Sequence, residues 1–198
     1  RGLPGTDLYT STATPGAGMM IGQIVWDENT GKAFRYTLAG ETLVRGNLLQ
    51  ESVEATTYEN MVVGTAGVAG DTYIQVTNGT STITSEQFRG GSIGVYTSGT
   101  SLIGEEYTIT GVSGTLTTGG ALKVYIDRPL RAAIAVTATV NMKQSPWSKV
   151  IQMPATSPTG MPVGVAIYPI ALGEYGWVQT HGICNVLSDA STFAVGSE

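Results

Sequence analysis

His181 and Cys184 are the most reactive side chains in the sequence, and each is the single residue of its type among 198. A nucleophilic thiol or hydroxyl needs a histidine within hydrogen-bond reach to act as its base. At strand spacing, residues three positions apart point to opposite faces, so only a short turn at Gly182 would bring His181 and Cys184 together. We therefore interpret them as a histidine at a strand end and a small buried thiol.

The acidic residues give no signal for metal binding or acid–base chemistry. Segment 27–31, Asp-Glu-Asn-Thr-Gly, is similar to the start of a calcium loop. Such a loop needs six or more oxygen ligands and usually ends in a bidentate Glu, which does not follow at a suitable spacing. The neighbouring pairs Asp27-Glu28 and Glu105-Glu106 point apart, whereas glycoside hydrolysis needs two acids facing across a cleft. We predict no catalytic, cofactor-binding or metal-binding residues, and no enzymatic activity.

Three tryptophans are the remaining candidates for a binding role: Trp26, Trp147 and Trp177. Tryptophans can line a platform for sugars, which leaves a carbohydrate-binding β-module as an alternative function. More often they anchor a core or a subunit interface. The apolar and aromatic residues that we predict to contact other subunits are Leu3, Leu8, Tyr9, Met19, Trp147 and Trp177.

The composition indicates an all-β chain that packs with other proteins. Charged residues make up 13% of the chain, against about 25% in typical globular proteins, and there are 27 glycines. Abundant Thr, Val, Ile and Tyr favour strands, and glycine supplies the positive φ angles of tight turns. Low charge also limits repulsion between many closely packed copies.

Charge and hydropathy bear on the possible partners. The net charge is −5, and the ten Lys and Arg residues are scattered singly, so we expect no nucleic-acid partner. The sequence has neither the roughly 20-residue apolar run that spans a bilayer nor a basic-then-apolar leader, which predicts no membrane association and synthesis in the cytoplasm.

Turn residues and alternation predict where the strands lie. The clearest element is a hairpin in which segments 21–26 and 32–38 flank the turn at 27–31. Segment 48–54 lacks Gly and Pro and predicts a short helix. The further strands that we predict are 72–77, 92–96, 107–110, 115–117, 122–127, 132–142, 163–168, 175–180 and 183–187.

These elements predict an all-β fold of short antiparallel strands, forming one or two barrel or sandwich units. Residues 1–20 mix Pro and Gly with isolated apolar residues and predict an extended N-terminal arm, either frayed or laid on a neighbouring subunit. Residues 21–64 and 144–198 are expected to form one β unit from both ends of the chain. Residues 65–143 are expected to form an inserted barrel or sandwich domain.

Several segments resemble, in order along nearly the whole chain, a family of virion proteins from tailed phages, many of them marine phages or cyanophages. The segments that carry this resemblance are 3–9 (Leu-Pro-Gly-Thr-Asp-Leu-Tyr), 31–36 (Gly-Lys-Ala-Phe-Arg-Tyr), 46–50 (Gly-Asn-Leu-Leu-Gln), 70–72 (Gly-Asp-Thr), 162–166 (Pro-Val-Gly-Val-Ala) and 175–180 (Tyr-Gly-Trp-Val-Gln-Thr).

The resemblance implies a capsid decoration or cement protein on the outer surface of an icosahedral head. Such proteins commonly form trimers near three-fold positions, so the implied partners are the major capsid protein and further copies of this chain. The family contributes no catalytic residues. Another phage structural component, such as a tail, connector or fibre-base protein, is the alternative within the same class.

Overall fold

In a computed structural model, the chain folds into two compact units made of antiparallel strands. The structure describes residues 7–187, except 17, 54, 78, 80, 85, 98–100 and 116–118. One unit contains the two ends of the chain, Arg1–Val53 and Pro146–Glu198, and the other contains Glu54–Ser145. The described residues include no α-helix, which confirms the predicted all-β fold.

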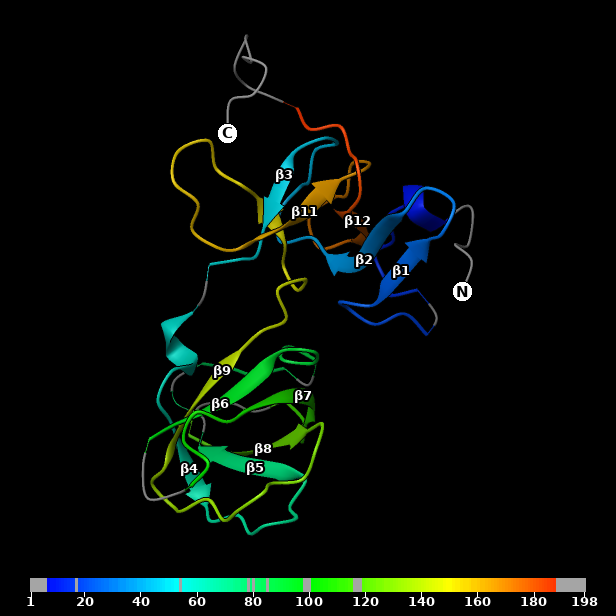
Figure 1. Cartoon of the computed structure of the whole chain (residues 1–198). Helices are drawn as coiled ribbons and strands as arrows, with labels where there is room; N and C mark the ends of the chain where they lie inside the picture. The colour runs from blue at the N-terminus through cyan, green and yellow to red at the C-terminus, as the bar shows by residue number, and fades with distance from the viewer. Residues whose placement is uncertain are drawn as a thin grey trace. The chain divides into compact units, whose positions relative to one another are not determined.

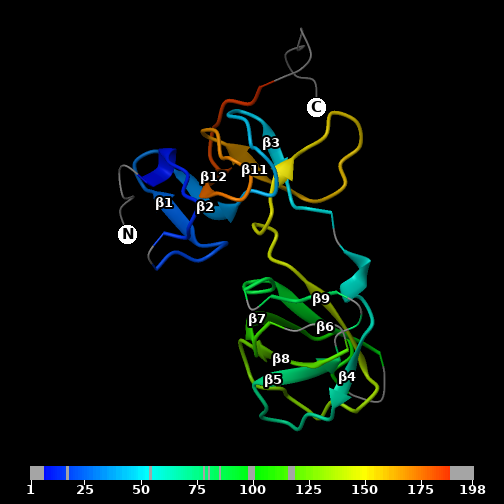
Figure 2. The same ribbon diagram turned by 180° about the vertical axis from the view of Figure 1, so that it is seen from behind.

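The unit formed by the chain ends is a six-stranded sheet with the strand order β1-β2-β12-β11-β3-β10 (Figure 1). Its strands are β1 (Ile24–Asp27), β2 (Lys32–Leu38), β3 (Leu48–Gln50), β10 (Ile151–Gln152), β11 (Pro162–Ala166) and β12 (Tyr175–His181). The most extensive pairing joins β2 to β12, at opposite ends of the sequence. Figure 2 gives the reverse view, in which β12 and β11 lie between β2 and β3.

The middle of the chain forms a closed six-stranded barrel in the order β4-β5-β8-β7-β6-β9. Its strands are β4 (Met61–Thr65), β5 (Tyr73–Thr77), β6 (Ser92–Thr97), β7 (Glu106–Val112), β8 (Ala121–Ile126) and β9 (Thr139–Lys143). A 3-10 turn, η2 (Thr56–Tyr58), precedes β4. Because β4 pairs with β5 and β9, residues 54–64 belong to the barrel unit and not to the unit formed by the chain ends.

Each unit has its own apolar core. The barrel encloses fully buried aliphatic and aromatic side chains, among them Phe88, Ile93 and Leu122. The sheet buries side chains on both faces: Phe34, Tyr36 and Trp177 cluster on one face, and Val178 packs with Leu49 and other residues on the opposite face. At about 25 cal/mol per Å² of buried apolar surface, such cores supply most of the stabilisation of a fold that has no disulfide.

The N-terminal segment packs on its own sheet. Residues Asp7–Tyr9 form the 3-10 turn η1, which contacts β12. Leu8 is 5% exposed and packs with Phe34, Tyr36 and Trp177. Thr12 then pairs with Tyr175 through two backbone hydrogen bonds of 3.0 and 2.8 Å. The described residues of this segment, 7–16 and 18–20, therefore pack against the unit formed by the chain ends.

Three predicted elements are wrong. The helix predicted at 48–54 is strand β3 at Leu48–Gln50, because pairing with β10 and β11 outweighs local helix propensity. The strand predicted at 132–142 is confined to Thr139–Lys143, and Thr137 has a positive φ of 77° that breaks the alternation. Residues 183–187 form no strand. The predicted strand 115–117 falls mostly outside the described residues.

Candidate interaction surface

An aromatic pair lies exposed on one face of the sheet, at its β1 side. Trp26 and His181 are both in register with Ala33 of the strand between them, so all three side chains are on the same face. Because Ala33 is small, the two rings meet above it, with centroids 5.5 Å apart and planes inclined at 56°. Trp26 is 50% exposed. The pair therefore presents aromatic surface to solvent while one side of each ring is supported.

Arg35 extends this surface along β2. Its guanidinium carbon lies 4.1 Å from the centroid of the Trp147 ring, and Nη1 donates a hydrogen bond of 2.7 Å to the carbonyl of Gly22. Trp147 is held in place because its carbonyl accepts hydrogen bonds from the Thr37 hydroxyl at 2.7 Å and the Leu38 N–H at 3.0 Å. The guanidinium is thus fixed at the sheet surface and not left as a freely rotating side chain.

We call this surface the Trp26 patch and define it as Ile24, Trp26, Arg35, Trp147 and His181. Ile24 belongs to it because it is in register with Arg35 and is 40% exposed. Tryptophan and arginine are the residue types most enriched at the energetic centres of protein interfaces, where rigid side chains lose little entropy on binding. The composition and rigidity of the patch suit it to contact another protein surface.

The patch adjoins a sheet edge with which no described strand pairs, because β1 is the terminal strand. The carbonyl of Gln23 accepts from the N–H of Tyr36 and that of Asp27 accepts from Gly31, each at 2.9 Å. Since inward- and outward-facing residues alternate along an antiparallel strand, Ile24 and Trp26 direct their N–H and C=O groups away from β2. A hollow of about 450 Å³ runs beside this edge, lined by residues 23–28 and Gly31.

The turn that ends β1 is held by Asp27. Its carboxylate accepts hydrogen bonds from the Thr30 hydroxyl at 2.5 Å and from the Asn29 N–H at 3.1 Å. The Thr30 bond is the largest cause that lowers the pKa of Asp27 below its usual value, so the carboxylate is charged at neutral pH. These bonds explain the spacing of Asp, Asn and Gly at 27–31 as turn chemistry.

The opposite edge of the sheet is closed by a side chain. Strand β10 has only two residues, and the N–H of Gln152 donates to the Glu41 carboxylate at 2.6 Å. The Gln152 side chain donates to the carbonyl of Thr42 at 3.2 Å. A short strand whose outward donor is already bound offers little to a further strand. Of the two terminal strands of this sheet, β1 is the one that offers an accessible edge.

Cys184 lies on the other side of the sheet from His181. It lines a hollow of about 620 Å³ together with Phe34 and Gln179. These two residues are paired in the β2–β12 register, one step along from Ala33 and His181, so they point to the opposite face. The structure therefore separates the two residues that a thiol–histidine site would need.

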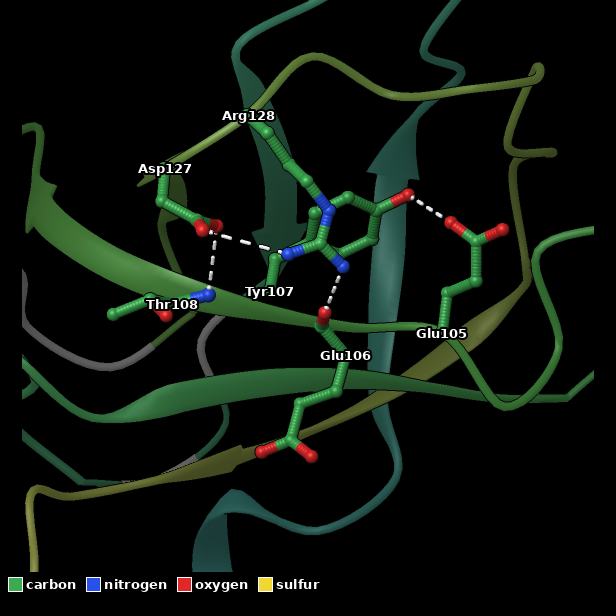
Figure 3. A network of polar contacts seen from close by, with 6 residues as sticks. All are labelled: Glu105, Glu106, Tyr107, Thr108, Asp127 and Arg128. Atoms are coloured by element: carbon green, nitrogen blue, oxygen red, sulfur yellow. Dashed lines mark hydrogen bonds and ion pairs between the residues drawn. The ribbon is translucent and has the colours of Figure 1, made fainter.

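A network of polar contacts on the barrel links β7 to the segment after β8 (Figure 3). The Tyr107 hydroxyl donates to the Glu105 carboxylate at 2.6 Å. Nε of Arg131, which the figure does not draw, donates to the same carboxylate at 2.6 Å. The Arg128 guanidinium carbon lies 4.6 Å from the centroid of the Tyr107 ring, and Nη2 donates to the carbonyl of Glu106 at 2.5 Å.

The electrostatics of this network favour a structural role. The Tyr107 hydroxyl and the Arg131 guanidinium hold the pKa of Glu105 below its usual range. Burial and the bond to Glu105 raise the pKa of Tyr107 above its usual value. Both shifts move away from neutrality, whereas a general acid or base works best with a pKa near the working pH. The carboxylate and the phenol fasten the 127–131 segment to β7.

The six predicted contact residues have different environments. Leu8 and Trp177 are 5% and 2% exposed within their own unit, so they have no surface to offer a partner, and Trp177 cannot serve as a sugar platform. Trp147 and Met19 are partly buried, Tyr9 is 63% exposed, and Leu3 lies outside the described residues. The sequence prediction missed Trp26, Arg35 and His181 as members of one surface.

Among the described residues, no three His, Cys, Asp or Glu side chains gather as metal ligands would. The same part of the chain has no helix of the length and hydrophobicity needed to span a membrane. No family model, no curated protein and no solved structure matches the chain.

Proposed function

We propose that this chain is a structural protein of a tailed-phage particle, a capsid decoration protein that binds the outer surface of the mature head. Its partners are the major capsid protein and further copies of itself, which form an oligomer, most simply a trimer. The support comes from the sequence resemblance, the low charge, and a fold made of a closed barrel and a sheet. The observation that carries the proposal is the rigid, exposed Trp26 patch beside a free sheet edge.

The mechanism follows from linkage. A protein that binds the expanded shell but not its precursor shifts the equilibrium toward the expanded state by an amount that grows with its free concentration. A tryptophan that is half exposed in the free chain gains apolar burial when a partner covers it. Arg35, whose guanidinium lies over the Trp147 ring, supplies planar donors without a large entropic cost. Many such contacts over one shell resist the internal pressure of packaged DNA.

The test is co-sedimentation of the purified chain with emptied, expanded heads of the phage that encodes it, and with unexpanded heads as the comparison. Binding to expanded heads is expected, and Trp26→Ala should weaken it at least tenfold, as truncation of a central interface tryptophan does. Leu172→Ala is the matched control, because Leu172 is 66% exposed and lies outside the patch. Absence of binding to either head, or equal binding by Trp26→Ala, would contradict the proposal.

Labelling of intact particles separates the two phage alternatives. A decoration protein labels the whole head surface, whereas a tail, connector or fibre-base protein labels one vertex. Label confined to a vertex would therefore replace the decoration role with the alternative in the same structural class.

A further inference from the structure

We propose that β1 pairs with β1 of a second copy in antiparallel orientation across a two-fold axis, which joins the two sheets into one. The inference goes beyond the proposed function, because it concerns a contact between copies and holds whatever surface the chain covers. It rests on three properties of the edge: its accessible backbone groups, the symmetry of its side chains and the placement of its charges.

The backbone of β1 is complementary to itself. Ile24 and Trp26 both direct their N–H and C=O groups away from β2, as the register with β2 requires. If Ile24 of one copy faces Trp26 of the other, the two residues exchange two hydrogen bonds, and the symmetric pair exchanges two more. Val25 then faces Val25 of the second copy, and the two-fold axis passes between them.

The side chains of β1 match this register. Residues that face each other on paired strands point to the same face of the sheet. Ile24 and Trp26, which are 40% and 50% exposed, would therefore meet Trp26 and Ile24 of the second copy on the face that carries the Trp26 patch. Four apolar side chains pack side by side at the axis while their outer surfaces stay exposed, and the two patches become one continuous surface.

The charges of the edge permit this pairing. In the same register Asp27 faces Gln23 of the second copy, and Glu28 faces Gly22. The acidic residues of the two copies are thus kept apart, although both lie at the same end of the strand. Like charges directly opposite each other would destabilise the pair. The hollow of about 450 Å³ beside residues 23–28 leaves room for the incoming strand.

Of the strand edges in the described structure, that of β1 is the one available for this contact. Among the described elements, the barrel strands form a closed ring, and the β10 edge is closed by Glu41. The contact itself is small, since β1 has four residues, whereas stable interfaces bury on the order of 1,600 Å². We therefore expect a weak two-fold contact in dilute solution, which joins two chains or two of the proposed trimers and becomes strong where many copies are held side by side.

The test measures dimerisation of the full chain by sedimentation velocity over a range of concentrations, with two substitutions at one position. Gln23→Lys places a lysine opposite Asp27 of the second copy, and Gln23→Glu places a carboxylate there. Each substitution acts twice because of the symmetry, so Lys should tighten the dimer roughly threefold to tenfold and Glu should weaken it by a similar factor. Both effects should shrink in high salt.

A third variant tests the backbone pairing. Ile24→Pro removes an outward N–H that β2 does not use, and it should abolish dimerisation while circular dichroism and the melting temperature show that the chain remains folded. The proposal is overturned if the chain is monomeric at all concentrations, or if the Lys and Glu variants shift the dimer in the same direction or not at all. A dimer that is lost on removal of residues 188–198 but unaffected by Ile24→Pro would assign the contact to the C-terminal segment and also overturn it.

Discussion

Removal of the Trp177 side chain should unfold one half of this chain before the other. Trp177 is 2% exposed, and its ring centroid lies 5.2 Å from that of Tyr36 within the cluster that also holds Leu8. Truncation of a buried tryptophan to alanine costs about 3–5 kcal/mol. Each kcal/mol lowers the melting temperature of a unit of roughly one hundred residues by about 4–8 °C, so Trp177→Ala should lower that of the sheet unit by at least about 12 °C.

The matched comparisons are Trp26→Ala, which removes the same atoms from a half-exposed site, and Phe88→Ala, which empties a fully buried site in the barrel. Hydrogen exchange followed by mass spectrometry reports the two units separately. Trp177→Ala should lose protection in 24–50 and 151–181, and Phe88→Ala in 61–143. Equal loss of protection across both units in either variant, or a cost for Trp177→Ala no larger than for Trp26→Ala, would refute the division into two cores.

Three further predictions concern single residues. Tyr107→Phe removes a hydroxyl that donates to a carboxylate, and urea unfolding should show a loss of about 1–2 kcal/mol from the barrel. Burial raises the pKa of Tyr168 to about 12. The unfolded chain therefore loses that proton first, and stability should fall as pH rises from about 10 to 12, an effect absent in Tyr168→Phe during alkaline unfolding. Gly91→Ala should cost at least roughly 2 kcal/mol, because a Cβ there would lie 2.1 Å from the Lys143 carbonyl oxygen, whereas Gly94→Ala, with open space around it, should cost less than 1 kcal/mol in the same assay.

The hairpin and the barrel strands could be predicted because their signals are local. The turn at 27–31 carries side chains that hydrogen-bond their own backbone, and the strands after it show the period of two. Leu48 and Gln50 carry no such signal. They become a strand because β10 and β11, about one hundred residues away in the sequence, pair with both sides of this segment. No local propensity encodes a partner at that distance.

The interaction surface could not be predicted for a related reason. Ile24, Val25 and Trp26 are all apolar, so alternation gives no sign of which face of β1 is buried. The N-terminal segment determines which face is buried, because its Leu8 packs on the face of Phe34 and Trp177 and leaves the face of Trp26 exposed. Likewise, Trp177 was expected at a contact and Trp26 was not, because the identity of a tryptophan says nothing about which element covers it.

The two units differ in their strand edges: the barrel is closed, whereas the sheet has two terminal strands, β1 and β10. This difference relates the fold to assembly. A closed barrel has no edge, and β10 is short and bound by a carboxylate. A chain with few charges is prone to pair through any edge left open, since charge is one of the main devices that protect edges. In such a chain β1 nevertheless keeps two outward-facing backbone positions and a half-exposed tryptophan, while its acidic residues stand only at one end. An edge that is accessible in the middle and charged at one end admits one register and one direction, which is what an ordered contact between copies requires.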